Sequence, residues 1–152
     1  MGMSDYVRAL RAKIGHDFVL MPAVGALIRN DAGRVLLVQH VEGRWQIPGG
    51  AIDPGERPAD ALRRECMEEA GVEIRVGRIL GAFGGPEHRI TYANGDEVGW
   101  VTSIFEAELV AGQPHPDHDE TQAVGWFAPD EVDALDMHPA TRATLRAALR
   151  AP

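Results

Sequence analysis

The sequence is poor in cysteine and in basic residues, and it has no long apolar run. Its single cysteine, Cys66, excludes an internal disulfide and suits a reducing compartment, so we expect a cytoplasmic protein. The sequence has 15 lysines and arginines against 23 aspartates and glutamates, so its net charge is −8. This charge disfavours a surface that binds nucleic acid or an anionic membrane. No apolar stretch approaches membrane-spanning length, and the start of the chain lacks the apolar segment of a signal peptide.

The overall composition is typical of a compact domain. At 152 residues the chain is long enough to bury a sizeable core, and its 45% hydrophobic and 25% charged content is ordinary for a globular protein. No linker, repeat or low-complexity tract interrupts it. We therefore expect a single domain over residues 1–152, with residues 1–15 as an N-terminal helical extension.

The most informative stretch is 50–72, which predicts a glycine-rich loop followed by a helix. Pro58 suits the first helical turn, where its missing N–H has no partner to lose, and Asp60 complements the helix dipole. Gly71 can adopt the left-handed conformation that ends helices. Spacings of three and four predict one apolar stripe, made of Ala59, Leu62, Cys66 and Ala70.

Beside that stripe lie three glutamates, Glu65, Glu68 and Glu69, at positions that share a helix face. Their mutual repulsion is unfavourable unless a cation neutralises them. Clustered carboxylate oxygens suit hard divalent cations such as Mg²⁺ or Mn²⁺. Glutamate pairs are also common on solvated helix faces, so spacing alone leaves both interpretations open.

The whole stretch fits the pattern Gly-x5-Glu-x7-Arg-Glu-aliphatic-x-Glu-Glu-x-Gly-aliphatic. The matching positions are Gly50, Glu56, Arg64, Glu65, Cys66, Glu68, Glu69, Gly71 and Val72. A chance match at a given start is expected about once in 10⁸ for residue types used at average frequencies. The stretch resembles the signature of the Nudix hydrolase superfamily. Cys66 departs from the usual aliphatic residue, but a buried cysteine behaves as a small hydrophobe.

This resemblance implies an α/β fold, a three-layer α/β/α sandwich with a mixed sheet against which the signature loop and helix pack. It also implies metal-dependent cleavage of a phosphoanhydride in a nucleoside diphosphate linked to another group. By motif position, Mg²⁺ or Mn²⁺ would be held by Glu65, Glu68, Glu69 and the Gly50 carbonyl. One of these glutamates could instead take the proton of the attacking water. Arg64 would pair with Glu68, and Glu56 would brace the loop behind the metal ligands.

Residues outside the signature are less constrained. An acidic residue beyond it often serves such enzymes as base or extra ligand, and Glu120 is our candidate, with a plain loop glutamate as the alternative. His115 and His118 alternate with Asp117 and Asp119, but without zinc-site spacing we expect a solvated loop there.

The substrate is expected to be a small nucleotide. Pro86 lies near the position of a proline found in many ADP-ribose-cleaving relatives, and Tyr92 near that of a tyrosine in dinucleoside polyphosphate hydrolases. Trp45, Phe83, Tyr92, Trp100 and Trp126 could each stack on a base, with core or hairpin packing as the more ordinary role of each. We favour ADP-ribose or a similar derivative, with dinucleoside polyphosphates or nucleoside triphosphates as alternatives. A binding regulator that lost hydrolysis is a further alternative, and capped RNA is disfavoured by the acidic balance.

The remaining elements follow from pattern and turn signals. We expect Ser4 to cap the first helix. Arg8, Arg11 and Lys13 are expected to face solvent, with contact to an anion as the alternative. Asn94-Gly95 predicts a hairpin. We expect strands at 19–29, 34–41, 45–50, 72–83 (bulged at Gly77 and Gly81), 88–93, 97–109 and 121–128, and later helices opening at 129–132 and spanning 139–149. Apolar surface on the first helix and the hairpin predicts a homodimer.

Overall fold

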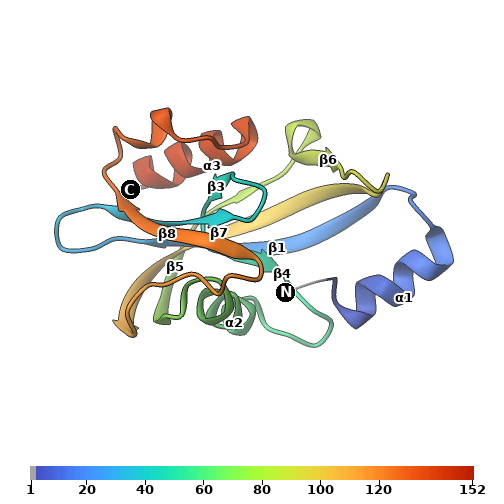
Figure 1. The fold of residues 1–152 in the computed structure, drawn as a ribbon, viewed down its shortest axis with the longest axis horizontal. Helices are drawn as coiled ribbons and strands as arrows, with labels where there is room; N and C mark the ends of the chain where they lie inside the picture. Colours follow the sequence, from blue (N-terminus) through green and yellow to red (C-terminus); the bar gives the residue numbers. More distant parts are fainter. Residues whose placement is uncertain (1–2) are drawn as a thin grey trace.

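A computed structural model describes residues 3–152 as a mixed α/β fold (Figure 1). The elements in chain order are α1 (Asp5–Ile14), β1 (Val19–Ile28), β2 (Val35–His40), β3 (Trp45–Gln46), β4 (Gly49–Ala51), α2 (Pro58–Ala70), β5 (Glu73–Phe83), the 3-10 turn η1 (Pro86–His88), β6 (Arg89–Thr91), β7 (Glu97–Ala111), β8 (Thr121–Phe127), the 3-10 turn η2 (Val132–Ala134) and α3 (Pro139–Arg150). Within residues 3–152, no helix has the length and apolar character required to cross a membrane.

The strands form two sheets. The larger has the order β4-β1-β7-β5, with β6 added to β7, and the smaller has the order β3-β2-β8. β1 and β7 pair in parallel from Val19 opposite Val98 to Ile28 opposite Ala107, whereas β4, β5 and β6 pair antiparallel to their neighbours. The sheet is therefore mixed, as the sequence predicted.

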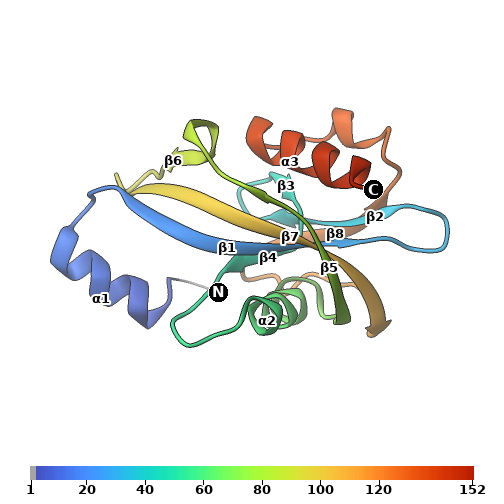
Figure 2. The ribbon, with the colours of Figure 1, turned by 180° about the vertical axis from the view of Figure 1, so that it is seen from behind.

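Helices α2 and α3 cover opposite sides of these sheets, as the two opposite views show (Figures 1 and 2). Successive side chains of a strand point to opposite faces, so β1 can serve both sides. Its Val24, Ala26 and Ile28 join a buried cluster with Leu62 of α2, and its Leu27 joins a second cluster that includes Leu145 of α3. The predicted α/β/α sandwich is confirmed.

Two local expectations need correction. The segment 45–50 does not form one strand, because it divides into β3 of the smaller sheet and β4 of the larger one. Gly49 packs so closely on β1 that a Cβ there would lie 2.0 Å from the carbonyl oxygen of Val24, so only glycine fits.

The helix expected to open at Pro129 is only the short turn η2, which begins at Val132. The bulges expected at Gly77 and Gly81 are confirmed by register shifts in the β5–β7 pairing.

The N-terminal helix α1 begins as predicted, because the Ser4 side chain accepts a hydrogen bond from the Val7 amide at 3.3 Å. The expectation that Arg11 faces solvent is wrong. Its side chain is only 9% exposed and contacts the β6–β7 hairpin. The Arg11 guanidinium is instead satisfied by three backbone carbonyls and by the carboxylate of Asp96.

Candidate active site

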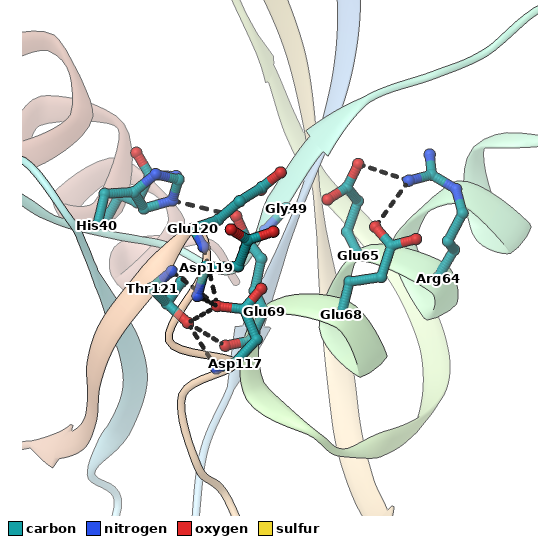
Figure 3. Close-up of polar contacts among 11 residues, drawn as sticks. His40, Gly49, Arg64, Glu65, Glu68, Glu69, Asp117, Asp119, Glu120 and Thr121 are labelled. Atoms are coloured by element: carbon teal, nitrogen blue, oxygen red, sulfur yellow. Dashed lines mark hydrogen bonds and ion pairs between the residues drawn. The ribbon is translucent and has the colours of Figure 1, made fainter. Parts of the chain in front are cut away.

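Helix α2 presents its glutamates in two different environments. Glu65 and Glu69 are buried, with 6% and 2% of their surfaces exposed, whereas the Glu68 side chain is 33% exposed. Residues four apart share a helix face, so Glu65 and Glu69 both point towards the β4 side of the helix, and Glu68 points towards Arg64 (Figure 3). Gly71, with φ of 64°, ends the helix in the left-handed conformation that was predicted.

Arg64 connects the loop before α2 to the glutamates on it. Its Nε and Nη2 donate to the two carboxylate oxygens of Glu56 at 2.8 and 2.9 Å. Its Nη1 lies 2.8 Å from Glu65 Oε1 and 3.3 Å from Glu68 Oε2, so the contact with Glu68 is present but is not the main one. The hydrogen bonds with Arg64 lower the pKa of Glu56, and those with Glu56 and Glu65 raise the pKa of Arg64.

Glu65 is a buried carboxylate whose charged form is disfavoured. Burial raises its pKa to about 7, and the nearby charges of Glu69 and Glu68 act in the same direction against the hydrogen bond from Arg64. The loop backbone packs directly on this carboxylate, since a Cβ on Gly50 would lie 2.5 Å from Glu65 Oε1. The site therefore disfavours the charged form of Glu65 unless more positive charge arrives.

Glu69 is held from two other elements. Its Oε2 accepts a hydrogen bond from the Gly49 amide at 3.0 Å, and its Oε1 lies 3.1 Å from Nε2 of His40 on β2. Burial lowers the pKa of His40, but the hydrogen bond and charge of Glu69 outweigh it, so the pKa of His40 is raised overall. Sequence reasoning did not identify His40, because its partner lies 29 positions away and no local motif connects the two.

The loop before β8 brings Glu120 to the same place. Asp117 folds this loop by accepting hydrogen bonds from the amides of Asp119, Glu120 and Thr121 at 2.9–3.0 Å. The Thr121 hydroxyl donates to the Glu69 carbonyl at 2.8 Å, which ties the loop to α2. Figure 3 shows the Glu120 side chain directed towards Glu69.

These residues surround a cleft of about 510 Å³. The cleft is lined by most of the sequence-predicted residues, namely Gly50, Arg64, Glu65, Glu69, Glu120, Trp45 and Tyr92, and also by His40. Glu56, Glu68 and Pro86 are not among its lining residues. Pro86 lies in η1 and is exposed.

The chemistry of the donors fits a hard divalent cation. Buried carboxylate oxygens and a backbone carbonyl are the ligands that such ions prefer. Burial raises the pKa of Glu65 despite the hydrogen bond from Arg64, so a bound cation would favour the charged form of this carboxylate. Within residues 3–152, no three acidic, histidine or cysteine side chains already converge in a metal-binding arrangement. Arg64 lies between Glu65 and Glu68, so binding requires these side chains to shift.

Comparison with known proteins places the chain beside nucleotide hydrolases. The NUDIX domain family model matches residues 19–148. The nucleoside triphosphatase NudI of Escherichia coli K12 is 35% identical over 129 residues, which cover 79% of this chain and 90% of that protein. The structure of a MutT NUDIX hydrolase from Burkholderia pseudomallei aligns with a TM-score of 0.67 at 33% identity, over 88% of this chain and 98% of that one. The structure of an ADP-ribose pyrophosphatase from Streptococcus suis aligns with a TM-score of 0.68 at 25% identity, over 86% of this chain and 90% of that one.

Proposed function

Because the chain belongs to the Nudix hydrolase family, we propose that it hydrolyses a phosphoanhydride bond of nucleoside triphosphates with the help of a divalent cation. The observation that carries this proposal is the placement of Glu65 and Glu69, two buried carboxylates, in a cleft that Trp45 and Tyr92 also line. The carboxylates suit a metal-bound phosphate chain, and the aromatic rings suit a base.

Members of this family generally use divalent ions, and we assign Mg²⁺ or Mn²⁺ to this chain. The proposed ligands are Glu65, Glu68, Glu69 and the Gly50 carbonyl. When bound, such an ion polarises phosphoryl oxygens and lowers the pKa of a coordinated water. Arg64 orients the glutamates from behind. Glu120, or one of the signature glutamates, takes the proton that the attacking water loses as the anhydride bond breaks.

Nucleoside triphosphates are proposed because the relative that is 35% identical carries the name nucleoside triphosphatase. ADP-ribose is a second candidate, since the aligned structure from Streptococcus suis carries the name ADP-ribose pyrophosphatase. The position of Pro86 outside the cleft lends the second candidate no support, whereas Tyr92 in the cleft is compatible with either substrate or with a dinucleoside polyphosphate. A regulator without hydrolytic activity would have no need for the full set of signature carboxylates.

The test is a panel of nucleoside triphosphates, ADP-ribose and dinucleoside polyphosphates, each with Mg²⁺ and with Mn²⁺, and with products identified by mass. We expect metal-dependent release of pyrophosphate or phosphate from at least one triphosphate, faster than ADP-ribose is cleaved. Faster cleavage of ADP-ribose would favour the second candidate, and no cleavage of any compound would favour the regulator.

We further propose that the chain is one cytoplasmic Nudix domain with an N-terminal extension over residues 1–15, and that it forms a homodimer. Support for the dimer comes from large apolar side chains left open to solvent on α1, on the link after it and on the sheet. Tyr6, Phe18, Leu20 and Val101 are 49%, 45%, 63% and 39% exposed. Light scattering should give about twice the chain mass of 16.5 kDa at micromolar concentration, and a clean monomer mass would refute the dimer.

A further inference from the structure

The N-terminal helix lies outside the family domain, which begins at residue 19. Figure 2 shows α1 at one end of the molecule, beyond the ends of β1 and β7. The helix nevertheless borders the cleft that holds Glu65 and Glu69, because Ser4, Val7 and Arg11 are among the residues that line it. A segment outside the matched family domain thus contributes a wall to the active-site cleft.

This wall is fixed by a buried arginine. Arg11 Nη1 donates to the carbonyls of Gly15 and Asp17 at 3.1 and 2.6 Å, and its Nη2 donates to the Glu97 carbonyl at 3.1 Å. Its Nε lies 3.6 Å from the carboxylate of Asp96. These contacts join α1, the link after it and the start of β7 into one unit.

Asp96 completes the attachment from the hairpin side. One of its carboxylate oxygens lies 2.7 Å from His16 Nδ1, and the other accepts from Asn94 at 3.1 Å. The Asp96 side chain is only 9% exposed although it carries a charge, and His16, Asn94 and Arg11 provide the compensating contacts. The hydrogen bond with His16 lowers the pKa of Asp96, and the hydrogen bond from Asn94 and the positive charge of Arg11 act in the same direction.

Besides Val7, the cleft is lined by apolar and aromatic side chains of the hairpin and neighbouring strands. These residues are Val19, Met21, Ile90, Tyr92, Val98 and Trp100. Trp100 Nε1 donates to the Tyr92 hydroxyl at 3.2 Å, so the two rings hold each other. Nucleobases stack on tryptophan and tyrosine with useful affinity whatever their identity. The carboxylates elsewhere in the cleft repel a phosphate chain until a cation is present, but they leave this apolar part free for a base.

From the cleft shared by α1 and the hairpin, and on the premise of the proposed function, we propose that α1 forms one wall of the nucleoside subsite. Val7 contacts the base opposite Tyr92 and Trp100. Arg11 is a positioning residue, because its two terminal nitrogens already donate to backbone carbonyls and it holds the helix rather than the phosphate. The subsite offers stacking more than hydrogen bonds, so it accepts several bases.

The test compares Val7→Asp with Ala12→Asp. Both variants add one negative charge to the same helix, but Val7 lines the cleft whereas Ala12 is exposed and does not line it. With Mg²⁺ and a nucleoside triphosphate, we expect Val7→Asp to raise KM about tenfold or more with kcat within about threefold of wild type, because the step after binding is untouched. Ala12→Asp should match wild type. Arg11→Ala should raise KM in the same way as Val7→Asp.

A second measurement does not depend on hydrolysis. Adenosine, which carries the base without a phosphate, is titrated in chelator and followed by tryptophan fluorescence. Helix content is checked by circular dichroism, and Val7→Gln and Ala12→Gln serve as a milder pair. Weaker binding by the Val7 variants alone supports the subsite, even if no triphosphate is cleaved and the proposed function fails. Equal binding by the Val7 and Ala12 variants overturns the inference whether or not the protein is a hydrolase, and equal KM values do so if it is one.

Discussion

Arg64 and Glu56 are joined by two parallel hydrogen bonds, from Nε to Oε1 at 2.8 Å and from Nη2 to Oε2 at 2.9 Å. Forked arginine–carboxylate pairs of this kind are among the stronger and more directional contacts in proteins. The same guanidinium reaches Glu65 and Glu68 through Nη1. One side chain thus fixes the loop before α2 and the carboxylates on α2 relative to each other.

The first prediction follows from that geometry. Arg64→Lys keeps the charge but cannot reproduce the fork, so the loop and Glu65 lose their common support. We expect kcat to fall about 10- to 100-fold, as is typical when residues behind metal ligands are lost. Arg63→Lys is the matched control, because Arg63 pairs with the exposed Asp60 on the surface of α2. Steady-state kinetics in which both variants keep the wild-type kcat would contradict the role given to Arg64.

Glu68 provides a second prediction, because it contacts Arg64 without lining the cleft. If Glu68 turns to hold a metal ion, Glu68→Gln should lower kcat by about 100-fold or more, since an amide binds hard cations poorly. The thermal midpoint should change little at this partly exposed position. Glu73→Gln on the exposed start of β5 is the control, and a Glu68→Gln enzyme with near-normal rate at saturating Mg²⁺ would remove Glu68 from the metal site.

Glu65 makes the stability of the metal-free protein depend on pH. Its pKa is about 7 in the folded state against a usual value of 4.5. Between these values the folded state keeps a proton that the unfolded state releases, so the free energy of unfolding falls as pH rises, by up to about 3 kcal/mol. Relative to Glu65→Gln, wild type in chelator should therefore lose stability from about pH 4.5 to 7 and then level off. Denaturant titrations with a pH-independent difference would rule this out.

A related prediction concerns the bound ion. A cation that binds only the folded state stabilises it by mass action, and relief of the repulsion among Glu65, Glu68 and Glu69 adds to its affinity. Millimolar Mg²⁺ or Mn²⁺ should raise the wild-type melting temperature by several degrees over chelator. The Glu69→Gln variant should show a smaller rise. Identical melting curves for wild type with and without metal would count against the metal site.

The sequence predicted the signature helix well because its information is local. Pro58, Gly71 and the spacing of Glu65, Glu68 and Glu69 act within one helix, and the structure places Glu65 and Glu69 together in the cleft. Even the contact between Arg64 and Glu68 follows from a spacing of four, although the stronger pairing with Glu56 depends on how the loop folds.

The residues that were missed make contacts across long separations. His40 meets Glu69 only because β2 and α2 come together in the fold, and Arg11 meets Glu97 across 86 positions. The parallel pairing of β1 with β7 likewise has no local signal, since it depends on which strands become neighbours. In the sequence, arginines at helical spacing on a short N-terminal helix are typical of a solvent-exposed face. Only the fold shows that the β6–β7 hairpin buries one of them, Arg11.

We propose that the carboxylates of α2 hold a cation that is required for hydrolysis of nucleoside triphosphates. It is tested most directly by measuring phosphate or pyrophosphate release from a nucleoside triphosphate during a Mg²⁺ titration, for wild type and for Glu69→Gln. We expect no release in chelator, saturable activation of wild type, and a rate at least about 100-fold lower for Glu69→Gln at any Mg²⁺ concentration. Equal activation curves for the two proteins, or metal-independent release by wild type, would contradict it.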